Sequence, residues 1–351
     1  MNRAAIVGCL LGTAVGDALG LPYENLTYRR AQRLLGEPDV YRLIDRYGLV
    51  SDDTEHSCVV AQAMILAGND EGAFTSYLGR QMRRWFWALP TTAGMATLRA
   101  GLKLSLGMGP TRSGVFSAGN GPAMRSAILG VAIEDLKQLR AWVSISTRIT
   151  HTDPKADYAA FAVALAAHDA AAGVLGAGTD FVARLRDGLR DAGANELFEL
   201  VERAVGSVQR GESTREFAMS LGLERGVTGY CYHTVPVALH AAFRYQGDMR
   251  RGVPEVIRCG GDTDSMAAIV GGILGAEAGR AGIPAEWLHG IIDRPRTVDW
   301  MERLAGQLAE VRETGRRQRA LRLPVWDIVF RNAVVLIVVL AHGFRRVLPP
   351  Y

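Results

Sequence analysis

Four glycines, Gly8, Gly12, Gly16 and Gly20, recur at every fourth position near the start of this chain. Because residues four apart share one face of an α-helix, the spacing predicts a helix with a stripe of very small residues along one side. Glycine has no side chain beyond its hydrogen, so another helix can approach such a stripe closely. The pattern therefore predicts that the first helix is enclosed by other helices.

A second interpretation of this segment is a signal peptide, because Arg3 is followed by an apolar run over residues 4–15. The glycine stripe and the acidic Asp17, which interrupts the segment, argue against that interpretation. We therefore favour a buried first helix.

The 351 residues are 48% hydrophobic and 22% charged, which is ordinary for a globular protein. Helical patterns dominate, and we find neither an internal repeat nor a useful alternating strand pattern. The prediction is an all-α fold with one domain over residues 1–310 and a tail over 311–351. The net charge of +4 is spread along the chain, so no nucleic-acid partner is expected. Four scattered cysteines without a Cys-x-x-Cys pair fit a reduced, cytoplasmic location.

Two carboxylates and two hydroxyls fall within four residues at Asp262, Thr263, Asp264 and Ser265, directly after a glycine pair. Carboxylate and hydroxyl oxygens are the ligands preferred by hard divalent cations such as Mg²⁺, Mn²⁺ and Ca²⁺. The glycine pair allows a sharp turn that would direct both carboxylates to one centre. The apolar run at 266–279 predicts a buried helix that begins beside this centre.

A second oxygen-rich cluster, Ser51, Asp52, Asp53 and Thr54, also precedes an apolar helical run, at residues 58–67. Either cluster alone is typical of a helix cap, because short oxygen side chains accept hydrogen bonds from the first free amides of a helix. Two such clusters, each before a buried helix, favour a shared site with two metal ions.

Several polar loops are candidates for substrate binding. The glycine-rich passage 107–122 ends in Ser117, Gly119, Asn120 and Gly121, where Asn120 could cap a helix opened by Pro122 and so present amides to a phosphate. It lacks the Gly-Lys-Ser/Thr ending of a P-loop, and on its own it would be a capped turn.

Three further loop residues have both a functional and a structural interpretation. Glu24 follows a helix that Pro22 stops, and it is either a site carboxylate or a solvated loop residue. His151 could bond a ligand or cap its own loop. Tyr230 could stack on a base or be a half-buried core tyrosine.

The tail contains a continuous apolar run at residues 333–341, shorter than the roughly 20 residues that a transmembrane helix needs. Asp327, Arg331, His342 and Arg345 would project to one side of a helix. The tail could therefore pack on the domain, mediate dimerisation or lie weakly in a membrane interface. We favour packing or dimerisation.

Five segments of the chain, in the same order, resemble motifs of the ADP-ribosylglycohydrolase family, which includes dinitrogenase reductase-activating glycohydrolase. They are 12–24 (GTAVGDALGLPYE), 51–54 (SDDT), 119–125 (GNGPAMR), 150–154 (THTDP) and 259–265 (CGGDTDS). The resemblance covers about residues 5–305 and does not extend to the tail.

The resemblance implies an all-α fold with two divalent cations, Mg²⁺ or Mn²⁺. The implied metal ligands are Ser51, Asp52, Asp53, Asp262, Asp264 and Ser265, with serine at two positions where the family commonly has threonine. Glu24 and Asp264 are the implied catalytic residues. The implied substrate-binding residues are Ser117, Gly119, Asn120 and Gly121 around the diphosphate, and His151 and Tyr230 on the adenosine side.

The activity implied is metal-dependent hydrolysis of the bond between ADP-ribose and a side chain, with arginine on a protein favoured over serine or a small adduct. Two alternatives stay open. The protein could bind ADP-ribose without catalysis, or it could be a metal-dependent phosphohydrolase of a nucleotide diphosphate. The intact acids at Glu24, Asp52, Asp53, Asp262 and Asp264 argue against the first.

Overall fold

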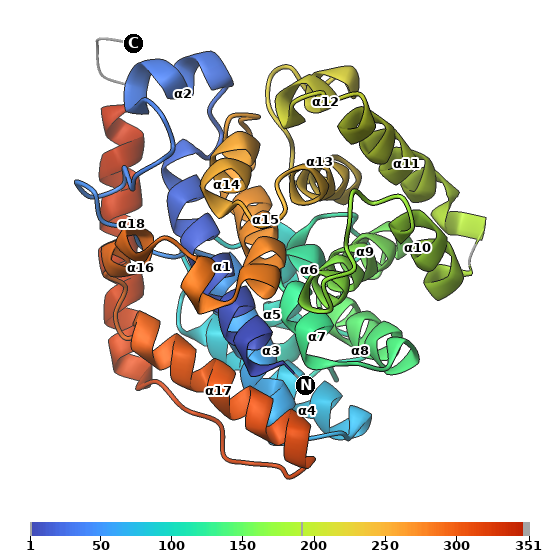
Figure 1. Cartoon of the computed structure of the whole chain (residues 1–351). Helices are drawn as coiled ribbons and strands as arrows, with labels where there is room; N and C mark the ends of the chain where they lie inside the picture. Colours follow the sequence, from blue (N-terminus) through green and yellow to red (C-terminus); the bar gives the residue numbers. More distant parts are fainter. Residues whose placement is uncertain (1, 191, 347–351) are drawn as a thin grey trace.

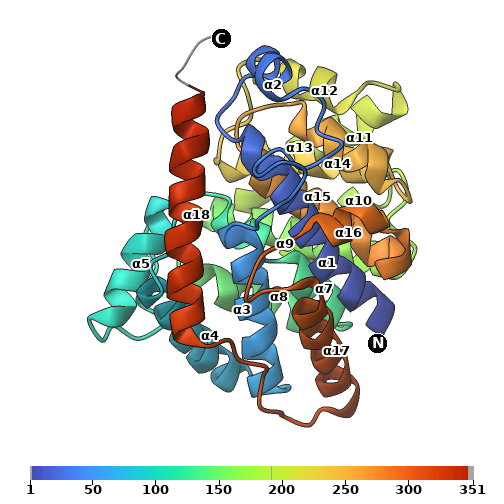
Figure 2. The same cartoon turned by 90° about the vertical axis from the view of Figure 1, so that its left-hand side faces the viewer.

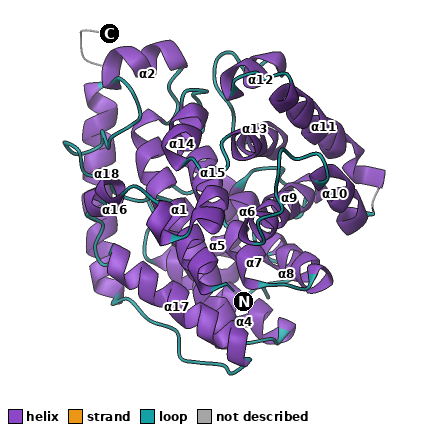
Figure 3. Cartoon of the chain, in the orientation of Figure 1, coloured by secondary structure: helices purple, strands orange, loops and turns teal. Residues whose placement is uncertain are grey.

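The computed structural model of the chain describes residues 2–190 and 192–346. Within these residues the regular structure is helical, with only isolated bridges between extended residues and no β-sheet (Figures 1 and 3). The predicted all-α class is therefore confirmed.

The centre of the fold is a pair of closely packed helices, α1 (Arg3–Gly20) and α15 (Thr263–Ala278) (Figure 1). All α1 residues from Ala5 to Gly20 are buried. A Cβ atom added to Gly12 would lie only 2.1 Å from the carbonyl oxygen of Gly271 on α15. The glycine stripe thus packs backbone against backbone, as the spacing predicted.

The other helices surround this pair in two shells. The inner shell consists of α3 (Asp52–Ala67), α7 (Ala127–Ala132), α9 (Pro154–Ala171), α13 (Cys231–Arg244), α14 (Met249–Ile257) and α17 (Val298–Thr314). Further out lie α2 (Tyr28–Leu35), α4 (Glu71–Trp87), α5 (Met95–Ser105), α8 (Leu136–Arg148), α10 (Phe181–Leu189), α11 (Asn195–Gln209) and α12 (Thr214–Ser220), while the short α16 (Ala285–Gly290) contacts α1. The short α6 (Gly121–Met124) borders the cavity described below, and a 3₁₀ turn, Leu21–Tyr23, directly precedes Glu24, which lines that cavity.

The tail forms one long helix, α18 (Val325–Arg345), which runs along the outside of the molecule (Figure 2). The expected domain boundary at residue 310 falls inside α17, which ends at Thr314. Counting only the apolar run at 333–341 underestimated this helix, whose 21 residues are long and apolar enough to cross a membrane. The first helix passes the same test, but its apolar window is 94% buried inside the protein, against 17% for α18.

Replacing Gly271 by alanine should destabilise the protein, because the new Cβ would lie 2.2 Å from the carbonyl oxygen of Gly12. Overpacking of this kind costs about 1–3 kcal/mol or more, since the two backbones must separate. Urea unfolding would measure the loss. As a control, Gly343→Ala adds a methyl group to α18 with no atom within 4 Å, and it should be neutral or stabilising by up to about 1 kcal/mol. Equal effects of the two substitutions would contradict the close packing of α1 and α15.

Candidate functional site

Two helix N-termini face the same cavity, and they carry the two oxygen-rich clusters. Ser51 caps α3, and its side-chain oxygen accepts a hydrogen bond from the Asp53 amide at 3.2 Å. Asp262 occupies the equivalent position before α15. The partial positive charge of each helix N-terminus favours the adjacent carboxylates. The two clusters, more than 200 residues apart in sequence, are therefore brought to one site.

The cavity between them has a volume of about 390 Å³. Eleven of the predicted site residues line it: Glu24, Asp52, Asp53, Ser117, Gly119, Asn120, Gly121, His151, Asp262, Asp264 and Ser265. The lining also includes residues that the sequence analysis did not single out, namely Thr92, Gly94, Met95, Ala96, Thr97, Met124 and Gly229. Met124 and Gly229 lie close in sequence to predicted residues, which could have indicated them, whereas the group at 92–97, around the start of α5, has no such neighbour and no sequence signal.

Two predicted residues are not in the cavity lining. Ser51 lies behind it, where its hydroxyl donates a hydrogen bond to Asp53 at 3.0 Å. Tyr230 does not line the cavity, although its neighbour Gly229 does. The Tyr230 hydroxyl instead accepts a hydrogen bond from Lys155 at 3.0 Å. This contact agrees with the structural alternative for Tyr230, and contact with an adenosine stays a prediction.

The carboxylates of the cavity are buried close to one another. Burial raises the pKa of Asp52, Asp53 and Asp264 well above the ordinary value, and repulsion from neighbouring carboxylates adds to the effect. Burial also raises the pKa of Asp262, and burial followed by the charge of Asp262 raises that of Glu24. The charged forms of these carboxylates are therefore disfavoured in the cavity, and a bound cation would stabilise them.

The donor set fits hard divalent cations, because it consists of carboxylate and hydroxyl oxygens. The Asp53 Oδ1 atom is buried without a hydrogen-bond partner among the described residues, so it has a lone pair free for a metal ion. In residues 2–190 and 192–346, however, no three His, Cys, Asp or Glu side chains are already arranged around one point. The two-metal arrangement thus stays a prediction.

Asp17, which the sequence analysis noted only as an interruption of the first apolar segment, supports the Ser51 cluster from behind. Its carboxylate accepts hydrogen bonds from the amides of Ser51 at 2.9 Å and Thr54 at 3.1 Å, and from the Thr54 hydroxyl at 2.5 Å. Burial raises the pKa of Asp17 to about 6, although these hydrogen bonds oppose the rise. The acidic residue in an otherwise apolar helix was the signal that could have identified this role.

Asn120 occupies the N-cap position of α6, as the sequence indicated it could, but its side chain makes no capping hydrogen bond. Its amide nitrogen instead donates to Asp262 at 2.6 Å and to Thr234 at 3.1 Å. A helix of only four residues also has a small dipole, so α6 offers less to a phosphate than the sequence indicated. Asn120 therefore connects the glycine-rich loop with the acidic cluster.

A buried arginine, Arg125, joins the glycine-rich loop to the loop of His151. Its guanidinium donates to the Gly121 carbonyl at 3.2 Å and to the Thr150 hydroxyl at 2.7 Å. The Thr150 hydroxyl also lies 2.9 Å from Nδ1 of His151. Burial and the nearby Arg125 charge lower the pKa of His151 to about 3, so the imidazole that faces the cavity is neutral.

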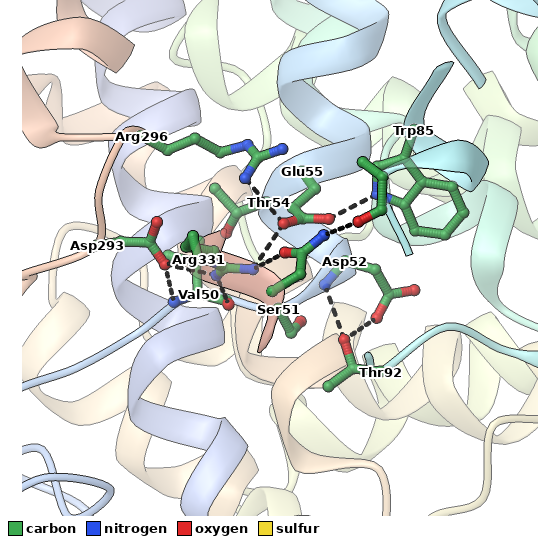
Figure 4. Close-up of polar contacts among 12 residues, drawn as sticks. Val50, Ser51, Asp52, Thr54, Glu55, Trp85, Thr92, Asp293, Arg296 and Arg331 are labelled. Carbon is green, nitrogen blue, oxygen red and sulfur yellow. Dashed lines mark hydrogen bonds and ion pairs between the residues drawn. The ribbon is translucent and has the colours of Figure 1, made fainter. Parts of the chain in front are cut away.

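The tail helix reaches the site through Arg331, as Figure 4 shows. The Arg331 guanidinium donates to Glu55 at 2.8 Å, to Asp293 at 2.5 Å and to the Val50 carbonyl. Asp293 in turn accepts from the Val50 amide at 3.2 Å. The residue immediately before Ser51 is thus held on both sides by the cluster.

The same helix holds the loop of Glu24. Nε2 of His342 lies 3.0 Å from the Pro22 carbonyl, and Arg346 donates to the Glu24 carbonyl at 2.9 Å. The inner face of α18 therefore packs on the domain, which was one of the two favoured alternatives for the tail.

The fold and the site together define a class of protein. Its members are all-helical and have a carboxylate-lined cavity flanked by a glycine-rich loop. Similarity to known proteins agrees with this class. A sequence model of the ADP-ribosylglycohydrolase family matches residues 2–318. The chain belongs to the ADP-ribosylglycohydrolase family, whose members are enzymes that hydrolyse ADP-ribose linkages.

Three relatives illustrate the range of the family. The chain is 32% identical over 312 residues to an uncharacterised protein of Archaeoglobus fulgidus, covering 86% of this chain and 95% of that protein. It is 26% identical over 315 residues to the ADP-ribosyl-[dinitrogen reductase] glycohydrolase of Rhodospirillum rubrum, covering 86% and 96%. The human ADP-ribosylhydrolase ARH3 is 26% identical over 322 residues, covering 80% and 87%.

A solved structure, described as an ADP-ribosylglycohydrolase-related protein complex, superposes with a TM-score of 0.64 at 26% identity. The match covers 88% of this chain and 98% of that one. The shared architecture therefore extends over nearly the whole of the solved chain.

Replacing Arg331 by methionine should cost about 3–5 kcal/mol, because it removes one partner of a buried ion-pair cluster. The carboxylates of Glu55 and Asp293 that it contacts are nearly inaccessible to solvent. The free energy of unfolding in urea would measure the loss. The control is Arg186→Met, whose ion-pair partner Glu202 is half exposed, and this change should cost less than about 1 kcal/mol. A loss of similar size in both variants would show that the cluster contributes no more than a surface ion pair.

Proposed function

We propose that the protein hydrolyses the glycosidic bond between ADP-ribose and an arginine side chain of a protein, releasing free ADP-ribose. The observation that carries this proposal is the convergence of Glu24, Asp52, Asp53, Asp262 and Asp264 on one cavity. The loop with Ser117, Gly119, Asn120 and Gly121 borders the same cavity. One substrate bound in this cavity would therefore place its reacting ribose near the carboxylates and its diphosphate near the polar loop.

The proposed cofactors are two divalent cations, Mg²⁺ or Mn²⁺. Ser51, Asp52 and Asp53 would hold one side of the metal centre, and Asp262, Asp264 and Ser265 the other. Such cations, when bound, orient substrate oxygens and lower the pKa of coordinated water. The unpartnered Asp53 Oδ1 and the buried like charges support this proposal.

Glu24 is the proposed proton-transfer residue. It lies in the cavity lining, at the end of the 3₁₀ turn that follows α1, while its backbone carbonyl is held by Arg346. From this loop the side chain can take a proton from the attacking water or give one to the leaving group. Asp264 is the second proposed catalytic residue, and its carboxylate is also one of the proposed metal ligands.

The proposed substrate positioning relies on neutral groups. The described cavity lining contains no lysine or arginine, so a diphosphate would be bound by the amides and hydroxyls of the glycine-rich loop and by the bound cations. Fixing the diphosphate there would orient the anomeric carbon toward the acids. Five carboxylates and no lysine or arginine in the described lining support a leaving group that is positively charged, as arginine is, over the neutral hydroxyl of serine.

Replacing Asp264 by asparagine should lower turnover at least about hundredfold, because the change removes a charge that the proposed centre needs. The assay supplies arginine-linked and serine-linked ADP-ribosylated peptides with Mg²⁺ or Mn²⁺, and it separates free ADP-ribose from AMP by chromatography. We expect ADP-ribose from the arginine-linked peptide and none with EDTA. The exposed Asp187→Asn is the control and should keep full activity.

Other products would select the alternatives. Release of AMP would identify a phosphohydrolase, and ADP-ribose binding without any product would identify a binding protein. Full turnover in both Asp262→Asn and Asp264→Asn would refute the assignment of the acidic cluster.

Metal binding can be tested without turnover. A saturating divalent cation should raise the melting temperature, since a ligand that binds only the folded state adds about 2.7 kcal/mol at a hundred times its dissociation constant. The rise should be absent in Asp264→Asn and present in Asp187→Asn. No rise in the unmodified protein with either Mg²⁺ or Mn²⁺ would count against the proposed centre.

A further inference from the structure

Helix α18 has its polar and apolar faces in the reverse of the usual arrangement for a surface helix. Arg331, Asn332 and His342 face inward and hydrogen-bond to the domain. The outward face carries a row of large apolar side chains, here called the outer stripe: Trp326, Phe330, Val334, Ile337, Leu340 and Phe344. Packing of the inner face therefore leaves the apolar face of the helix unpartnered.

The outer stripe is strongly exposed, with relative accessibilities of 82% at Trp326, 66% at Ile337 and 67% at Phe344. Its members are spread from Trp326 to Phe344, along nearly the whole of α18, the helix that runs down the outside of the molecule in Figure 2. At 21 residues the helix is about 30 Å long. Contiguous apolar surfaces of this kind mark sites of protein or membrane interaction.

Two exposed apolar side chains of a neighbouring segment lie near this helix. Asn332 of α18 donates to the carbonyl of Ala88 at 2.7 Å. The residues on either side of Ala88, Trp87 and Leu89, are 63% and 66% exposed. The end of α4, which the inner face of α18 contacts, therefore adds two exposed apolar side chains near that helix.

Positive charge lies at both ends of α18. The linker before the helix, residues 315–324, contains four arginines and no acidic residue, and Arg319 and Arg322 within it are exposed. At the other end are Arg345 and the neighbouring α2, which contains three arginines and no acidic residue. Its Arg30 donates to the Arg346 carbonyl at 2.8 Å, so α2 lies against this end of α18.

We propose that α18 docks the protein on the surface of an anionic lipid bilayer. The helix would lie in the plane of the interface, with the outer stripe at the boundary of the acyl chains and the arginines at both ends among the head groups. It would not cross the bilayer, because Arg331 and Asn332 are held by hydrogen bonds to the domain.

The charges favour a lipid surface over a second copy of the chain. Both ends of α18 are positive, so parallel and antiparallel pairing of two copies would each place arginines against arginines. Asp327 is the one acidic residue in the helix and cannot offset both ends. An anionic bilayer is complementary to the apolar stripe and to both groups of arginines.

The test is co-sedimentation of the full chain with vesicles. One set contains phosphatidylcholine alone, and the other contains phosphatidylcholine mixed with phosphatidylglycerol, an anionic lipid that attracts basic segments. We expect at least tenfold tighter binding to the anionic vesicles, weakened when the salt concentration is raised. The triple variant Phe330→Ser, Ile337→Ser, Leu340→Ser should bind at least tenfold more weakly.

Two controls keep the outcome interpretable. The matched control is Met219→Ser, which alters an exposed apolar residue on α12 and should bind as the unmodified chain does. Circular dichroism checks that the triple variant keeps its helices, as expected for substitutions on an outward face.

Absence of binding to anionic vesicles, or equal binding by the triple variant, would overturn the proposal. So would a concentration-dependent dimer that the triple variant abolishes, because a second copy would then cover the stripe. Sedimentation equilibrium without lipid detects that dimer. None of these outcomes depends on hydrolase activity, so the docking proposal and the proposed function can fail separately.

Discussion

The contact between the backbones of α1 and α15 is the constraint on which the rest of the structure depends. The last glycine of the stripe, Gly20, lies so close to α15 that an added Cβ would be 2.7 Å from the Cα of Asp264. The Thr263 hydroxyl donates to the Gly20 carbonyl at 2.9 Å and fixes this end of the pair. The chain then turns toward Glu24. Close helix packing therefore sets the distance between the acidic cluster and Glu24.

The cost of gathering buried carboxylates is offset locally by hydrogen bonds rather than by arginine or lysine in the cavity. Asp17 accepts from the Ser51 and Thr54 amides, and Asn120 donates to Asp262. Hydrogen bonds to a carboxylate favour its charged form, whereas burial disfavours it. Because burial is the larger effect at both Asp17 and Asp262, their pKa values remain raised. The buried carboxylates therefore reduce the stability of the fold, and they form a group whose charge a bound cation would neutralise.

Much of the fold and site could be predicted because the signals are local. The glycine spacing identified α1, and each acidic cluster lies at the N-terminus of a buried helix, as expected. Contacts between distant segments left no such pattern: Arg331 and Glu55 are 276 positions apart, and nothing near either residue indicates the other. The resemblance implied Tyr230 on the adenosine side, and its neighbour Gly229 lines the cavity while Tyr230 does not, so contact of Tyr230 with an adenosine stays a prediction. The length of α18 was underestimated because Arg331 and Asn332 interrupt its apolar pattern, and these are the residues that face the domain.

The two faces of α18 connect the proposed membrane surface with the candidate site. The inner face holds the Val50 carbonyl beside Ser51, and the C-terminal end of the helix holds the Glu24 carbonyl. A displacement of the helix would therefore act on both the acidic cluster and the loop of Glu24. Binding free energies are reciprocal, so any effect of a bilayer on cation affinity must equal the effect of the cation on bilayer affinity. The hydrogen bonds of Arg331 and Arg346 are the physical contacts through which such coupling would have to pass.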